Sequence, residues 1–294
     1  MPELESSLTT NRRHTVRLLT IALLVVIAAV CVGTGVYWIT LNSQSAEETA
    51  GDPGASDRVS VMATVERIDA PRYTASVRIW VIPRGSFTSD GGDTANRDIE
   101  VLATGITEGN LSLTGGRRIA STTVTVDLHD GEITNYPFDR YTGDLYVAAT
   151  RDGKNIPVEL VVENDDAFFT LSAAADSDST EPGLELQFTR SISTKFMVAL
   201  MFVVMWSLAL SVAAAAVIIV RKELGLLWMA MSWMAATLFA LTVFRGTAPG
   251  SPPFGCVLDY TAFLWAEAIV ACSLTYVVVH GVLKESRVLH ESRK

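Results

Sequence analysis

Three long apolar runs near the C-terminal end constrain this chain more than any other feature. They cover residues 196–220, 224–244 and 260–283, and each contains few or no charged side chains. A helix needs about 20 apolar residues to cross the hydrocarbon core of a bilayer. The mean hydropathy of the whole chain, +0.31, is also positive, which is unusual for a soluble protein. We therefore expect each run to be a transmembrane helix in contact with the lipid bilayer.

A fourth apolar run lies near the N-terminus, at residues 18–41, and follows the arginines of residues 1–17. It is longer than the roughly 7 to 15 apolar residues of a signal peptide. We therefore expect an uncleaved anchor, which brings the total to about four transmembrane helices. Small residues at positions 43–46 keep cleavage open as the alternative.

The basic residues beside these runs predict the orientation of the chain. Lys and Arg near the ends of transmembrane helices stay on the cytoplasmic side. The arginines of residues 1–17, the pair Arg221 and Lys222, and the basic tail at residues 284–294 would all share that side. We expect a multi-pass protein of the plasma membrane with both termini in the cytoplasm, a tight turn at residues 221–223, and its main domain outside.

Between the runs at residues 18–41 and 196–220 the sequence predicts a linker at residues 42–57 and an acidic domain at residues 58–194. Residues 42–194 contain about 25 acidic and about 12 basic side chains, counted along the chain. Within the domain Val77, Ile79 and Val81 alternate with more polar neighbours, as expected of a strand with one buried face. Eight such β-rich segments occur: 59–68, 75–82, 99–103, 121–128, 143–148, 157–162, 168–173 and 184–188. They predict an antiparallel β-sandwich.

Composition and motifs argue against several classes of function. An acidic domain repels nucleic acid, because binding to phosphates depends on Lys and Arg. The sequence contains no glycine-rich phosphate loop, no paired histidines at metal spacing and no Gly-x-Ser-x-Gly turn, so we expect no catalytic residues, cofactor or metal. The aspartates at 165, 166, 176 and 178 do not match a calcium loop, and we favour a solvated acidic loop over a cation site.

One candidate site is a shaped loop at residues 136–141. Its members are Tyr136, Pro137, Phe138, Asp139, Arg140 and Tyr141. Proline holds the preceding residue extended, and a bond between Asp139 and the neighbouring Arg140 could fix the loop between aromatic rings. Two interpretations remain: a corner that only stabilises the sandwich, or a loop that contacts the membrane helices or a partner.

A second candidate site combines Arg245, Asp259 and Glu267, which flank or follow the outer turn at residues 245–258. Glu267 lies about 12 Å deeper along the helix than Asp259, where an unpaired carboxylate is costly. One interpretation is structural: Arg245 pairs with Asp259, or Glu267 bonds to a neighbouring helix. The other is a pathway for an ion, a proton or a ligand. Both this turn and the loop at 136–141 would lie outside, so we expect the two to meet.

The chain resembles an uncharacterised family of actinobacterial, largely mycobacterial, membrane proteins, the domain-of-unknown-function family 4436. The resemblance covers nearly the full length and includes the Tyr-Pro-Phe-Asp loop. It is most specific over residues 245–267, in Arg245, Pro249, Gly250, Pro252, Pro253, Phe254, Gly255, Leu258, Asp259, Tyr260, Phe263, Trp265, Ala266 and Glu267. The resemblance implies the topology described above and carries no activity.

A weaker resemblance is to pentameric ligand-gated ion channels. It rests on the loop at 136–141, on Leu186, Phe188 and Arg190 leading into the next helix, and on the proline turn before Asp259. The chain departs from those channels in having three helices after the sandwich instead of four. The helix that would line a pore also presents a mostly apolar stripe: Leu227, Ala230, Met234, Thr237, Leu241 and Phe244.

These observations favour a non-enzymatic protein of the cell envelope whose exterior sandwich binds a partner protein or an envelope ligand, with a homo-oligomer as one form of partner. The alternative is a channel-like or proton- or ion-coupled membrane protein related to pentameric ligand-gated channels.

Overall fold

The computed structural model describes residues 31–36, 38–39, 48–89, 94–104, 111–116, 121–175, 182–222 and 228–291. The chain divides into two compact units, residues 1–43 and residues 44–294. In the first unit, residues 31–36 and 38–39 are helical. Most of the predicted first membrane helix, at 18–41, lies outside the described residues, as does part of the predicted turn at 221–223.

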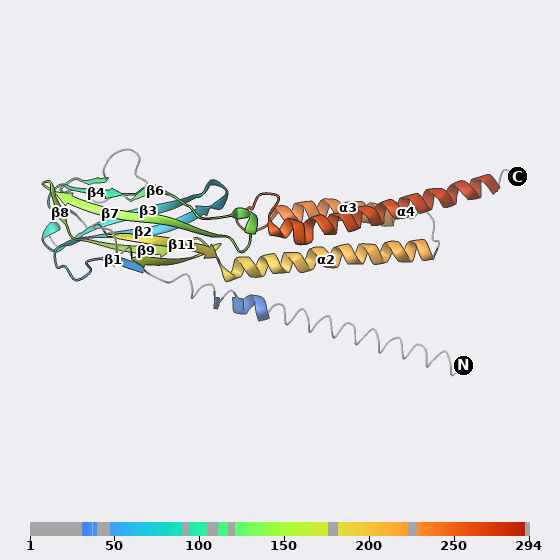
Figure 1. The fold of residues 1–294 in the computed structure, drawn as a ribbon, viewed down its shortest axis with the longest axis horizontal. Helices are drawn as coiled ribbons and strands as arrows, with labels where there is room; N and C mark the ends of the chain where they lie inside the picture. Colours follow the sequence, from blue (N-terminus) through green and yellow to red (C-terminus); the bar gives the residue numbers. More distant parts are fainter. Residues whose placement is uncertain are drawn as a thin grey trace, which may run out of the picture. The chain divides into compact units, whose positions relative to one another are not determined.

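Two β-sheets make up the first part of the larger unit (Figure 1). One has the strand order β1-β9-β2-β3-β6, and the other has the order β10-β11-β7-β4-β5, with β8 also paired to β7. The strands in the described residues are β1 Glu48–Gly51, β2 Arg58–Asp69, β3 Thr74–Arg84, β4 Ile99–Ala103, β5 Leu111–Leu113, β6 Thr122–Asp127, β7 Arg140–Arg151, β8 Lys154–Ile156, β9 Val158–Asn164, β10 Phe169–Ala175 and β11 Gly183–Arg190.

The core between the sheets follows the predicted alternation of side chains. In β3, Ala75, Val77, Ile79 and Val81 are fully buried, whereas Trp80 between them is exposed. The same period in β7, β9 and β11 contributes to one continuous apolar cluster that draws on both sheets. All eight predicted strands are present, and the domain is sandwich-like, as expected.

The structure corrects the expected sandwich in two respects. Residues 48–51, which we assigned to the linker, form β1 and pair with β9. The sheet β1-β9-β2-β3-β6 is also mixed, because β2 and β9 pair in parallel, so the sandwich is not purely antiparallel. A four-residue strand of mostly polar residues carries no clear alternation, and no local pattern reports the direction of a partner strand far along the chain.

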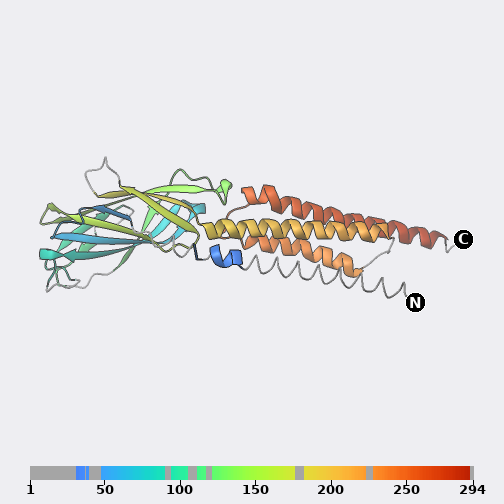
Figure 2. The same cartoon turned by 90° about the horizontal axis from the view of Figure 1, so that it is seen from below.

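Three helices follow the sandwich, and Figure 2 shows them together from a second side. They are α2 Ile192–Arg221, α3 Trp228–Gly246 and α4 Leu264–Glu291, and α4 is preceded by the π-helical turn η4 Asp259–Phe263. Each is long and apolar enough to cross a membrane. These helices confirm the three predicted C-terminal apolar runs as long helices, and three candidate membrane spans indicate a multi-pass membrane protein.

The three helices pack through a shared apolar seam, in which α4 contacts both α2 and α3. The seam includes Met205, Ala209, Val212, Met234, Leu241, Ala266 and Val270. Large apolar side chains on the opposite faces remain exposed, as expected for surfaces that meet lipid.

Candidate functional site at the junction of sheets and helices

The junction begins with Arg190, the last residue of β11. It continues the inward-facing series that contains Leu186 and Phe188, so its side chain points into the core at the end of the sandwich next to α2. None of this side chain is exposed. Ser191 then caps α2, because its hydroxyl accepts a hydrogen bond from the Thr194 backbone N–H. The sandwich therefore passes into α2 with no intervening loop.

Asp139 neutralises Arg190 in the core. The Arg190 Nε donates to Asp139 Oδ1 over 3.0 Å, and Nη2 donates to Oδ2 over 2.9 Å. The Asp139 side chain is as fully buried as that of Arg190. Tyr141 donates a further hydrogen bond from its hydroxyl to Asp139 Oδ2, over 3.0 Å. Charge-assisted forks of this kind fix the position and the orientation of both side chains.

Aromatic rings enclose the Arg190 guanidinium. Its central carbon lies 4.1 Å from the centre of the Phe169 ring and 4.9 Å from that of Tyr136. The Tyr136 hydroxyl donates to the backbone carbonyl of Pro249 over 3.0 Å. Burial raises the pKa of both Tyr136 and Tyr141 above the ordinary range, so both phenols stay protonated and remain donors. Tyr136 thus connects the sandwich to the loop between α3 and α4.

Gly250 lets that loop approach the cluster closely. Its φ is +73°, and a Cβ at this position would overlap Nη1 of Arg190. Arg190 cannot easily move away, because Asp139 and two rings hold it. Nη1 is itself buried and has no hydrogen-bond partner in the described part of the chain. A glycine is therefore required here both by the backbone and by the space available.

A second buried ion pair, between Arg245 and Asp259, joins the end of α3 to the start of η4. The Arg245 Nε donates to Asp259 Oδ1 over 2.6 Å, and Nη2 donates to Oδ2 over 2.7 Å. Arg245 also donates to the carbonyls of Pro252 and Pro253, each over 2.9 Å. The ring of Phe254 packs on the guanidinium at 4.4 Å.

Backbone groups complete this second cluster. Asp259 Oδ2 accepts from the N–H of Gly255 over 2.7 Å and from that of Cys256 over 3.2 Å. Burial raises the pKa of the Cys256 thiol, which keeps the thiol protonated. Arg245 and Asp259 therefore bind backbone groups of the α3–α4 loop as well as each other, and these bonds fix the conformation of the loop. The structure thus contains the ion pair of our structural interpretation for Arg245 and Asp259.

Glu267 lies eight residues after Asp259, about 12 Å further along the helix, and has its own partner. The Thr242 hydroxyl of α3 donates to Glu267 Oε1 of α4 over 2.6 Å. This contact between neighbouring helices corresponds to the hydrogen bond that we considered for Glu267. Arg245 pairs with Asp259, so the three candidate polar residues form two separate contacts.

The loop at 136–141 and the turn after α3 meet, as expected, through Tyr136 and Pro249. The expected bond inside the loop is wrong: Asp139 pairs with Arg190, and Arg140 is exposed. Arg140 opens β7 with its side chain on the outer face, so it points away from the carboxylate that precedes it. Phe138, the residue before Asp139, is 71% exposed.

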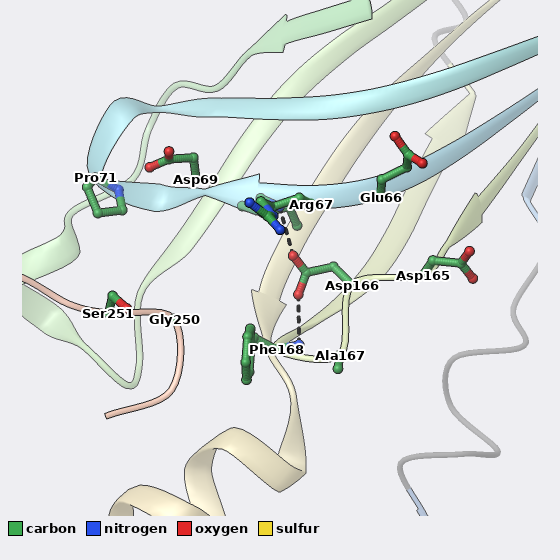
Figure 3. A pocket seen from close by; sticks show the side chains of 11 residues that line it. Glu66, Arg67, Asp69, Pro71, Asp165, Asp166, Ala167, Phe168, Gly250 and Ser251 are labelled. Carbon is green, nitrogen blue, oxygen red and sulfur yellow. Dashed lines mark hydrogen bonds between the residues drawn. The ribbon is translucent and has the colours of Figure 1, made fainter. Parts of the chain in front are cut away.

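A pocket of about 440 Å³ lies beside the junction (Figure 3). The ends of β2 and β9 and the α3–α4 loop contribute to it, the last through Gly250 and Ser251. Its charged lining residues are Glu66, Arg67, Asp69, Asp165 and Asp166.

Several of these charged side chains already have partners within the protein. Glu66 pairs with Arg78, and Asp69 pairs with Arg72. Asp166 accepts hydrogen bonds from the backbone N–H groups of Ile68, over 2.8 Å, and Phe168, over 2.7 Å. The exposed side chain of Asp165 adds negative charge at the mouth of the pocket. A pocket of this charge suits a cationic group better than an anion. In the part of the chain that is described, no group of three or more potential metal ligands is present.

The apolar stripe of the predicted run at residues 224–244 faces the interior of the helix bundle. Met234, Thr237 and Leu241 are buried, and Met234 and Leu241 belong to the seam shared with α2 and α4. Within one chain this stripe therefore lines no open path. Leu227 lies outside the described residues.

Arg190 and Gly250 are the junction residues whose roles the sequence analysis missed. A signal for Arg190 was present, since it lies in phase with the buried residues of β11 and a buried arginine requires a carboxylate partner. For Gly250 the signal was weaker: a glycine between two prolines predicts a turn, but not which side chain packs against it.

Comparison with protein families divides the chain at this junction. The model of a domain of unknown function (DUF4436) matches residues 49–189, and a second domain of unknown function (DUF8686) matches residues 190–284. The motif at residues 245–267, which we associated with the first family, thus falls in the second model. No curated protein matches the chain. The Asp139–Arg190 pair and the Tyr136–Pro249 bond both cross the boundary, so they connect the segment that matches the first model to the segment that matches the second.

Proposed function

We propose that this chain is a non-enzymatic plasma-membrane protein of the cell envelope, whose sandwich is an extracytoplasmic binding module coupled to its membrane helices. The observation that carries this proposal is the buried junction. A passenger domain on an anchor needs only a linker, whereas this sandwich continues directly into α2 through Arg190 and contacts the α3–α4 loop through Tyr136.

The chemistry of the junction supports a binding role over catalysis. Asp139 and Asp259 are each held by an arginine and further donors, so neither carboxylate is available as a general base. Buried networks of ion pairs and hydrogen bonds such as these rigidify a structure and favour one arrangement. A rigid junction transmits a displacement of the sandwich to the ends of the helices.

The pocket beside the junction supplies a place for the ligand. An occupant would touch the sandwich at Asp165 and the α3–α4 loop at Gly250 and Ser251 together. Its charge favours a cationic group, carried either by a small envelope molecule or by a side chain of a partner protein. Because the junction is rigid, an occupant that displaces the sandwich would also displace the ends of the helices, which is how binding outside would reach them.

Photo-cross-linking in intact membranes tests this proposal. A benzophenone amino acid at Asp165, at the pocket mouth, should give an adduct that the same probe at Asn155, in the exposed strand β8, does not give. Spermidine or a lysine-rich peptide should compete with the Asp165 adduct. Identical products from both positions, or products limited to the chain's own helices, would count against a binding module at this site.

The channel-like alternative gains no specific support, because the stripe that would line a pore is buried within the helix bundle.

A further inference from the structure

The turn that carries Phe138 has buried residues on both sides of Phe138 and an exposed side chain at its tip. Phe138 is 71% exposed, although Tyr136, Pro137 and Asp139 around it are buried. Its backbone N–H donates to the Asn135 carbonyl over 2.8 Å, which closes a tight turn. The Phe138 side chain therefore projects from a backbone that is fixed by this turn, and its large apolar ring is exposed.

Two contacts place this tip near the outer ends of the membrane helices. Tyr136, two residues before it, bonds to Pro249 in the α3–α4 loop, three residues after α3 ends at Gly246. Asp139, one residue after it, bonds to Arg190 at the start of the helical region. The turn is thus tied to the loop that connects two candidate membrane spans, and its height above the membrane is set by that loop.

Exposed aromatic residues also gather at the outer end of α4. Phe254 in the α3–α4 loop is 70% exposed, Tyr260 in η4 is 63% exposed and Trp265 in α4 is 59% exposed. The indole N–H of Trp265 donates to the Tyr260 carbonyl over 2.8 Å. Aromatic side chains at the ends of membrane helices typically lie at the level of the lipid headgroups.

The charges around Phe138 suit contact with lipid, in contrast to the acidic domain that bears it. The exposed Glu132 accepts a hydrogen bond from the Asn135 side chain at the start of the turn, over 3.1 Å. Asp139, the residue after Phe138, is turned inward and neutralised by Arg190. The next side chain on the outside is the exposed, cationic Arg140. An aromatic tip beside a positive charge matches the boundary between acyl chains and phosphate headgroups.

We propose that Phe138 inserts into the headgroup region of the leaflet that the α3–α4 loop faces, with Arg140 beside the lipid phosphates. This inference rests on the outward orientation in the proposed function. It gives the sandwich a second attachment to the membrane, separate from the peptide link to α2, and places the pocket close above the lipid surface.

Depth-dependent fluorescence quenching tests the inference on the full chain. The exposed Cys31 and Cys272 are replaced by Ala and the buried Cys256 is kept, so that an NBD label attaches only at the chosen position. Label sites are Phe138→Cys and, as the matched control, Lys154→Cys in β8. Lys154 lies opposite Arg151 at the far end of β7, about 36 Å from the start of that strand along its 11-residue rise. The proteins are reconstituted in phosphatidylcholine and phosphatidylglycerol vesicles with or without nitroxide on the lipid headgroup.

We expect the nitroxide lipid to reduce the NBD signal at least twofold at position 138 and to leave position 154 unchanged. Adding Arg140→Glu should weaken the quenching at 138. A third label, Tyr260→Cys, separates the possible failures. Quenching at 260 without quenching at 138 would overturn the lipid contact and leave the proposed position of the α3–α4 loop at the membrane surface intact. No quenching at either position would overturn both.

Discussion

At the scale of single residues, the Asp139–Arg190 pair is the most consequential contact between the two domains. Both side chains are fully buried, and Arg190 still leaves one nitrogen without a partner. Burying both charges is costly, so the pair need not add net stability compared with two apolar side chains. We infer that its role is to select one arrangement of the sandwich on the helices.

This role predicts a strong asymmetry between single and double substitutions. Arg190→Met leaves the Asp139 carboxylate buried without its cationic partner and should destabilise the sandwich by about 3 to 5 kcal/mol. The double variant with Asp139→Leu should recover much of that loss. Thermal unfolding of the detergent-solubilised protein, followed by circular dichroism, measures both effects.

The matched control is Arg97→Met. Arg97 and Asp152 form an ion pair at 4.0 Å whose side chains are 71% and 76% exposed, and such pairs contribute little. We expect its unfolding temperature to equal that of the unchanged protein. A loss at Arg190 no greater than the loss at Arg97 would show that the buried pair does not hold the junction.

At the scale of structural elements, the loop between α3 and α4 depends on Gly250. Gly250→Ala places a side chain in a left-handed backbone conformation, which costs roughly 1 to 2 kcal/mol, and its Cβ overlaps Arg190. We expect faster hydrogen exchange in residues 247–258 and around Tyr136. Gly246→Ala is the control, because its Cβ would meet nothing within 4 Å. Equal exchange in both variants would contradict a close approach at Gly250.

Elements with a strong local pattern were predictable from the sequence. In the eight β-rich segments and the three apolar runs, the residue types themselves indicate which side chains are buried. Val77 and Ile79 in β3 are examples. The strands β1, β5 and β8 have only three or four residues, which is too short for a period to show. The parallel pairing of β2 with β9 is a tertiary choice that neither strand encodes alone.

The candidate site shows the same limit. The sequence indicated that the loop at 136–141 and the turn after α3 would meet, because both are shaped and both were expected outside. It offered Arg140 as the partner of Asp139, since adjacency is visible in a sequence. The true partner, Arg190, is brought in by the pairing of β11 with β7, in which Thr189 lies opposite Arg140. Partner choice in the core therefore depends on strand register.

At the scale of the whole molecule, orientation decides whether the acidic sandwich meets envelope ligands or the cytoplasm. Arg221 ends α2 and Lys222 follows it, and the last turns of α4 carry Lys284 and Arg287. The positive-inside rule then predicts a cytoplasmic tail and an external sandwich. The sandwich precedes α2, and three crossings separate it from the tail, so the two must lie on opposite sides of the membrane.

Cysteine accessibility in intact cells measures this orientation. In a background with Cys31→Ala and Cys272→Ala, a membrane-impermeant maleimide should label Lys154→Cys in the sandwich without permeabilisation. The same reagent should label Ser286→Cys, near the end of α4, only after the membrane is opened, because its charge prevents it from crossing the bilayer. The reverse pattern would place the sandwich in the cytoplasm and remove the basis for an envelope ligand. Labelling of both positions in intact cells would instead show that the three helices do not all cross, since an odd number of crossings cannot leave both positions on one side.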